Sequence, residues 1–258
     1  MMEKNVWALF FLGLVAGFAS AFLGIGGGVI LVPGLIAIGF GIKRAIGTSL
    51  VGLIAISIVG AMTHFFLQPE NIFFKLVIFI LIGAILGSKI GSELVKKINS
   101  KHLSLLFSFF LIFVLLRMLN FINFAGLEQN TPPEFFIPVG IITGLFGGIA
   151  SSFFGIGGGT IYVPFLTIFF GLPIHSAVAT SITAIVGTTL FGAFFHKKIK
   201  NTDYYSAKII IPTGLIGAFI GAIISTVVTA PNLEFIFGIF LFLVAISIIY
   251  SYFKKNGE

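Results

Sequence analysis

Two nearly identical glycine-rich phrases are the residues of this sequence best suited to hold a ligand. "FLGIGGGVILVP" occupies positions 22–33, "FFGIGGGTIYVP" occupies positions 153–164, and nine of the twelve positions agree. Each glycine disfavours a helix interior by about 1 kcal/mol relative to alanine, so each phrase predicts a broken helix or a hairpin. Glycine leaves its backbone N–H groups uncovered and tolerates positive φ, as a backbone nest for an anion requires. The start of the following helix adds its dipole, so the predicted chemistry is reversible anion binding.

The predicted anion contacts are the glycines of the two phrases, namely Gly24, Gly26, Gly27, Gly28, Gly155, Gly157, Gly158 and Gly159. A nucleotide phosphate loop is excluded, because neither phrase follows a β-strand or precedes Lys-Ser/Thr. Close packing between helices stays open as an alternative. Packing glycines usually recur every fourth residue, and we interpret two such series as packing stripes: Gly83, Gly87 and Gly91, and Gly217, Gly221 and Ser225.

Hydroxyl side chains follow each phrase at matching positions. Thr48 and Ser49 stand about 15 residues after the first phrase, and Thr180 and Ser181 stand at the same place after the second. We predict that they donate to the anion. The alternative is a bond to a carbonyl of their own helix, which is common for Ser and Thr in membrane helices. Ser20 and Ser151, four residues before each GIGGG, are further candidates of the same kind.

His64 and His196 are a matched pair of ionisable residues, 132 positions apart. Histidine titrates near physiological pH, so a role in proton coupling is one hypothesis, and a solvated helix end is the other. Lys89 and Arg117 are the deepest charges, and each either snorkels or faces the pathway. There is no cysteine, no HExxH motif and no Asp or Glu in mid-span. We therefore expect that the chain is not an enzyme and that it binds no metal and no cofactor.

The composition describes the elements that must position these residues. Of 258 residues, 58% are hydrophobic and 9% are charged, whereas an ordinary soluble domain is about a quarter charged. Apolar runs of 18 or more residues recur along the chain, and each is a candidate membrane span. The net charge of +7 does not indicate nucleic acid, because the Lys and Arg residues stand in short loops between apolar runs. The chain is predicted to be a polytopic membrane protein.

The apolar segments form two parallel series. In the first half they cover residues 5–23, 29–40, 45–67, 72–94 and 103–121, with a basic loop at 41–44 and a turn at 68–71. In the second half they cover residues 135–154, 160–171, 177–195, 204–229 and 233–253. The segments after the glycines are too short to span a bilayer, which needs about 20 residues, so each belongs to a hairpin or broken helix. Pro33 and Pro164 are expected to cap or kink them.

The halves align over most of their length, which indicates an internal duplication. We predict an N-terminal repeat over residues 1–122, an extracytoplasmic linker over 123–134 and a C-terminal repeat over 135–258. Thirteen of the fifteen Lys and Arg residues fall on one predicted side, which places both termini in the cytoplasm. The first half then crosses the membrane an odd net number of times, so the second half is inserted upside down. Such inverted repeats are typical of secondary transporters.

Twin GIGGG-x-x-x-VP phrases, each followed by Thr-Ser, resemble the TauE/SafE family of sulfite and organosulfonate exporters. The resemblance covers nearly the whole chain, from Leu12 to about Ile249. It implies a prokaryotic inner-membrane transporter whose substrate is sulfite, sulfoacetate, another sulfonate or thiosulfate. An anionic substrate agrees with the helix-start argument above, which was made from the residues alone.

These observations together predict an all-α membrane protein of two inverted repeats, each with a hairpin or broken helix and three transmembrane helices, or eight to ten helical segments. The expected function is export of a small sulfur-containing anion by alternating access. The alternatives are a channel-like anion pore and a membrane partner protein that transports nothing. The expected partners are a small anionic substrate and the lipid bilayer, with no nucleic acid. The sequence predicts no oligomeric state.

Overall fold

The structure is a computed structural model of the chain, and it describes residues 6–97, 135–197 and 202–254. Over these residues the chain is helical and has no β-strand. Seven long helices are α1 (Val6–Leu23), α3 (Ile42–Leu67), α4 (Phe74–Lys97), α6 (Phe136–Phe154), α8 (Ile174–Lys197), α9 (Tyr204–Val227) and α10 (Ala230–Lys254). Two short helices are α2 (Gly28–Ala37) and α7 (Gly159–Phe170), and a 3₁₀ turn, η1 (Pro69–Asn71), joins α3 to α4. The all-α prediction is confirmed.

Six of the described helices are long and apolar enough to cross a membrane: α1, α3, α4, α6, α8 and α9. Their outward faces carry many large apolar side chains, such as Trp7, which is 70% exposed, and Phe66, which is 72% exposed. A water-soluble protein rarely exposes so continuous an apolar surface, whereas a bilayer solvates it. The chain is a multi-pass membrane protein. The predicted third span, residues 103–121, lies outside the described residues, as do Arg117 and the predicted linker.

Two outer helix pairs are held together by the predicted packing stripes. α1 packs along α9, and α4 packs along α6. A Cβ atom on Gly87 would overlap the carbonyl oxygen of Leu145 on α6, and one on Gly221 would overlap that of Phe18 on α1. Only glycine permits backbones to approach this closely, which is how helices associate where no water drives them together. The interpretation of both glycine series as packing stripes is confirmed.

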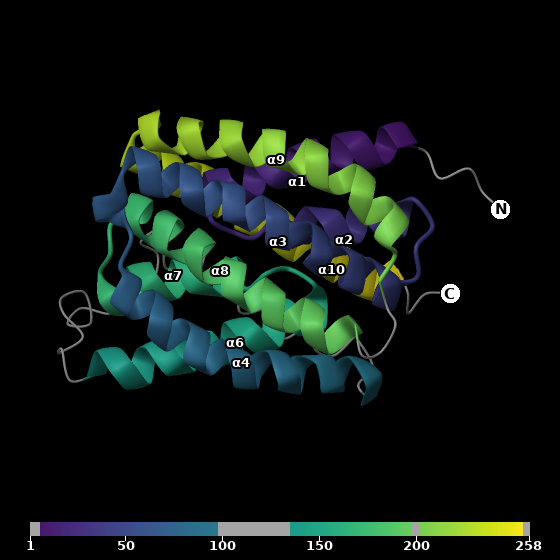
Figure 1. Cartoon of the computed structure of the whole chain (residues 1–258), viewed down its shortest axis with the longest axis horizontal. Helices are drawn as coiled ribbons and strands as arrows, with labels where there is room; N and C mark the ends of the chain where they lie inside the picture. Colours follow the sequence, from purple (N-terminus) through teal and green to yellow (C-terminus); the bar gives the residue numbers. More distant parts are fainter. Residues whose placement is uncertain (1–5, 98–134, 198–201, 255–258) are drawn as a thin grey trace.

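The central helices α3 and α8 lie between these outer pairs, as Figure 1 shows. The packing is nearly unchanged when the halves are exchanged, because α3 contacts α9 as α8 contacts α4, and α2 contacts α3 as α7 contacts α8. In Figure 1, α1 starts on the side of the N-terminus, whereas α6 starts at the opposite end of the bundle and runs the other way. This arrangement supports two inverted repeats. Their insertion across a bilayer, and the side of each terminus, stay predictions.

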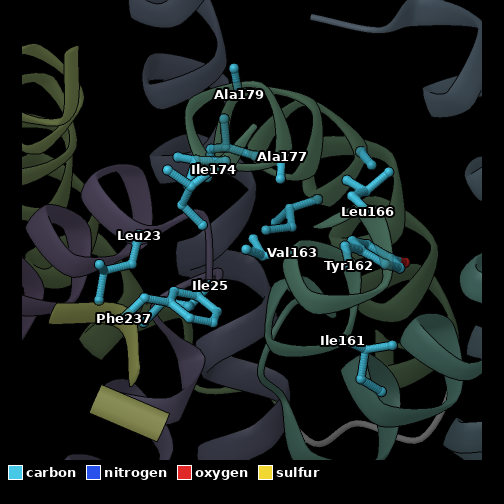
Figure 2. Packing of buried hydrophobic residues seen from close by; sticks show 14 of the residues in the cluster. Leu23, Ile25, Ile161, Tyr162, Val163, Leu166, Ile174, Ala177, Ala179 and Phe237 are labelled. Carbon is cyan, nitrogen blue, oxygen red and sulfur yellow. The ribbon is translucent and has the colours of Figure 1, made fainter. Parts of the chain in front are cut away.

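Buried apolar side chains from both halves meet around the two helix breaks. One cluster joins Leu23 and Ile25 of the first half to Ile156, Tyr162 and Val163 of the second. Figure 2 shows part of this cluster, with Ile25 and Tyr162 among its labelled side chains. Phe237 of α10 belongs to the same cluster. The breaks therefore stand inside protein, where non-helical backbone is tolerated at membrane depth.

The structure differs from the sequence prediction in two local features. The predicted basic loop at 41–44 is wrong beyond Gly41, because α3 already begins at Ile42 and includes Lys43 and Arg44. Lys and Arg are good helix formers, so charge alone did not mark a loop. Pro33 and Pro164 stand inside α2 and α7, so they cap neither helix, and the kink given as the other possibility stays a prediction. The predicted turn at 68–71 is present as η1.

Candidate anion site at two helix breaks

The two glycine phrases break the helices where the sequence predicted. α1 ends at Leu23 and α2 begins at Gly28, while α6 ends at Phe154 and α7 begins at Gly159. Three glycines of each break have positive φ: Gly24 (66°), Gly26 (86°) and Gly27 (59°), and Gly155 (73°), Gly157 (85°) and Gly158 (95°). Residues with a Cβ rarely adopt this backbone, so glycine is required at these positions.

Both short helices begin without a side-chain cap. Gly27 is the N-cap of α2, Gly158 is the N-cap of α7, and neither start receives a side-chain hydrogen bond. Each N-cap carbonyl accepts from the third and fourth N–H groups after it, at 3.0–3.1 Å. The Gly28 N–H donates to the carbonyl of Gly26 at 2.6 Å. The positive ends of two helix dipoles point into buried glycine loops. This is the arrangement that favours an anion.

The two breaks contact each other directly, backbone against backbone. A Cβ on Gly26 would lie 2.5 Å from the carbonyl oxygen of Ile156. A Cβ on Gly28 would overlap the carbonyl of Gly155, and a Cβ on Gly159 would overlap that of Gly24. Close packing, the alternative left open above, is therefore correct for these glycines in this conformation, together with the predicted helix break. The same glycines therefore both break the helices and allow the backbones to pack closely.

A crossed pair of hydrogen bonds joins the two halves at the breaks. The Ser49 hydroxyl of α3 donates to the carbonyl of Gly155 at 2.8 Å, and the Ser181 hydroxyl of α8 donates to the carbonyl of Gly24 at 2.7 Å. All four groups are buried. A serine of each half therefore forms a hydrogen bond with the break of the other half. The predicted role of both serines as anion donors stays a prediction, because both hydroxyls already have an acceptor here.

Thr48 and Thr180 also bridge segments from different halves. Thr48 donates to the Arg44 carbonyl of its own helix at 2.7 Å and accepts the N–H of Asp203 at 2.9 Å. Thr180 accepts the N–H of Phe73 at 3.1 Å and lies 3.3 Å from the carbonyl of Asn71, to which it donates. Thr48 therefore makes the bond within its own helix that we gave as the alternative. A role for either threonine in substrate binding stays a prediction.

The two histidines are buried, so the alternative of a solvated helix end is wrong. His64 is 2% exposed and His196 is 0% exposed. The Nε2 of His64 donates to the carbonyl of Ala21 at 3.1 Å, and that of His196 donates to the carbonyl of Ser152 at 2.8 Å. Each therefore ties the end of a central helix to the residues just before a break. Proton coupling through them stays a prediction.

Single motifs of the sequence did not predict two features around the breaks. Asp203 is the N-cap of α9, and Asn71 is the last residue of η1, so the offset of 132 aligns two polar residues that lie just before the equivalent helices α9 and α4. Aligning the whole repeat would have found this pair. Tyr162 has no such counterpart, because Leu31 stands in its place. Its ring fills the space beside Gly147 and Gly158, and its hydroxyl lies 2.8 Å from the Thr188 hydroxyl.

A small cavity of about 50 Å³ lies beside the second break. Val32 and Ile46 line it and also contact Gly155, and Lys43 of α3 contributes a charged side chain. Lys89 is instead exposed on the outer face of α4, which favours snorkelling over a place in the pathway. Lys43 is therefore a cation that the structure brings near the second break.

Comparisons with known proteins find relatives among membrane transporters. The family model for the sulfite exporter TauE/SafE matches residues 139–258. The probable membrane transporter protein YunE of Bacillus subtilis is 28% identical over 93% of this chain and 96% of its own length. A probable membrane transporter protein of Xylella fastidiosa strain 9a5c is 30% identical over 92% of both chains. The sulfite exporter TauE/SafE family protein 3 of Arabidopsis thaliana is 32% identical over 33% of this chain and 19% of its own. No solved structure gives a significant match.

Proposed function

Because this chain belongs to the sulfite exporter TauE/SafE family of membrane transporters, we propose that it carries small sulfur-containing anions across a prokaryotic cell membrane. The substrates in this proposal are sulfite, sulfoacetate or another organosulfonate, and thiosulfate. The proposed direction is export, and the proposed mechanism is alternating access. No covalent step is involved.

The observation that carries the proposal is the meeting of two uncapped helix starts at crossed serine bonds. An anion placed between the breaks would receive the N–H groups of α2 and α7, which are supported by both dipoles. The buried polar residues in the described part of the chain include no Lys or Arg. Neutral donors would therefore compensate the charge of the anion, which lets it leave as readily as it enters.

The crossed bonds also suggest how access alternates. Opening a path from either side requires the breaks to part, which releases Ser49 from Gly155 or Ser181 from Gly24. A released hydroxyl needs a new acceptor, because an unsatisfied buried hydroxyl costs about 1–3 kcal/mol. The oxygens of the anion are suitable acceptors. In this proposal, the anion and the break carbonyls compete for the hydroxyls of the same two serines. In each opened state, one of the two serines donates to the anion instead of to its carbonyl.

Counterflow of labelled sulfite in proteoliposomes tests the proposal. Saturable uptake that is accelerated by unlabelled sulfite inside the vesicles is the expected result for a carrier. A current that grows linearly with anion concentration would replace the carrier with a channel-like pore. No flux of sulfite, thiosulfate, taurine, sulfoacetate or sulfate would overturn anion transport altogether and favour a membrane partner protein.

A further inference from the structure

Several buried hydroxyls beside the two breaks have no hydrogen-bond partner in the described part of the chain. They belong to Ser20, Ser151, Ser152 and Thr160, and all four side chains are fully buried. Helical Ser and Thr can usually bond a carbonyl of their own helix, as Ser57 and Thr143 do here at 2.7 and 2.8 Å. A buried hydroxyl that forgoes this option requires an explanation.

Three of these hydroxyls belong to residues next to the two breaks, in space or along the chain. The Cβ of Ser20 lies against Gly27, the N-cap of α2, because a Cβ on that glycine would be 3.1 Å from it. Thr160 stands in the first turn of α7. Ser151 is the counterpart of Ser20, and its carbonyl accepts the N–H of Gly155, where the second break begins, at 2.7 Å.

Ser152 points elsewhere and is left out of the set. Its hydroxyl oxygen would lie 3.1 Å from a Cβ on Gly192, and the side chain of Leu50 on α3 would lie 3.2 Å from the same Cβ. It therefore faces the crossing of α3 and α8 rather than a helix start. The hydroxyls of Ser49 and Ser181, by contrast, already donate to carbonyls across the breaks.

We infer that Ser20, Ser151 and Thr160 are direct hydroxyl ligands of the transported anion, an inference that rests on the proposed function. Each is a neutral, fully buried donor next to a break, and none has a hydrogen-bond partner to give up in the described part of the chain. If the three hydroxyls and the helix-start N–H groups bind one anion, they would suit a head group with three oxygens on one atom, such as sulfite or a sulfonate. A carboxylate offers only two oxygens. Val29 stands where the second half has Thr160, so the start of α7 is the richer in donors.

The test compares stability with affinity in purified protein. The probes are sulfite, methanesulfonate and acetate, and the variants are Ser20→Ala, Ser151→Ala and Thr160→Val. Ser88→Ala and Ser225→Ala are matched controls, because their hydroxyls are also buried without a partner in the described part of the chain but belong to α4 and α9, which contribute no residue to the breaks. All five variants should keep or raise the melting temperature without anion, since each removes an unsatisfied group.

Only the three variants at the breaks should weaken binding of sulfite and methanesulfonate, each by about tenfold, the effect of losing one hydrogen bond to a charged group. The wild type should bind methanesulfonate more tightly than acetate. Unchanged affinity in the three variants, equal losses in the two controls, or a lower melting temperature without anion would each overturn the inference and leave the proposed function intact. Equal affinity for methanesulfonate and acetate would overturn the three-oxygen head group. A wild type that binds none of the probes would overturn the proposed function, and this inference with it.

Discussion

The two helix breaks have the same backbone but different surroundings. Both contain three glycines at positive φ, both start a short helix without a cap, and each receives a serine from the other half. Around the first break stand Ala16 and Leu31, whereas around the second stand Gly147 and the ring of Tyr162. The backbone and the crossed serines are therefore what both halves share, while the packing behind each break has diverged. The two breaks have the same geometry without being energetically equal.

The largest expected effect comes from separating the breaks. Gly28 and Gly159 have no positive φ, so the cost of alanine there comes from overlap and not from backbone strain. A Cβ at Gly28 overlaps the backbone of the second break, and a Cβ at Gly159 overlaps the backbone of the first break and the Cδ1 of Ile185. Gly28→Ala and Gly159→Ala should each destabilise the protein by about 3 kcal/mol, at the upper end of overpacking costs, and abolish sulfite counterflow. Gly41→Ala is the matched control, since nothing lies within 4 Å of its Cβ position. The melting temperature checks the loss of stability, and the counterflow assay checks the loss of transport. Wild-type values in either variant would contradict the direct contact between the two breaks.

The next effect tests the divergence itself. Tyr162→Leu gives the second break the side chain that the first has, but leaves the space beside Gly147 unfilled. We expect a loss of about 2 kcal/mol from the cavity, measured by thermal or denaturant unfolding. Adding Gly147→Ala, the residue at the equivalent position of the first half, should recover part of it. If Tyr162→Leu costs nothing, the second break does not depend on its aromatic support.

A smaller loss of stability should be the same for the two crossed serine bonds. Ser49→Ala and Ser181→Ala each leave a buried carbonyl without its crossed donor, so each should cost about 1 kcal/mol. Ser57→Ala is the control, because that hydroxyl bonds only carbonyls of its own helix. Unfolding of the two single variants and the double variant measures the effects. A tenfold difference between the single variants in folding equilibrium would show that only one crossed bond matters.

The smallest expected effect concerns the charge in the first turns of α3 and α8. Lys43 opens α3 beside the cavity at Gly155, and the residue aligned with it in α8 is His175. A full charge concentrates anions near it at low ionic strength. Lys43→Gln should raise the KM for sulfite about threefold at low salt and lose this effect at about 0.5 M salt, where charges are screened. His175→Gln should change the KM less. A salt-independent change would assign Lys43 a direct contact instead.

The sequence predicted the breaks because glycine runs act locally, through backbone freedom at each residue. It did not predict that Ser49 would bind Gly155, because no local pattern shows which segment of the other half lies opposite. The repeat did predict that Ser181 would behave as Ser49 does, since aligned residues of two similar halves share their surroundings. Burial of His64 was missed for a related reason. A nearby basic or polar segment suggested solvent, while α1 of the same half covers the ring.

The crossed serine bonds have a consequence for how such a molecule can arise. One half contains both the donor and the carbonyl that complement each other, so the contact is self-complementary in the manner of a two-fold dimer interface. Two identical copies inserted in opposite directions would satisfy the same bonds without any second gene. Fusing the copies then frees each to change its packing, as at Leu31 and Tyr162, while the shared contact restrains the serines and glycines of both.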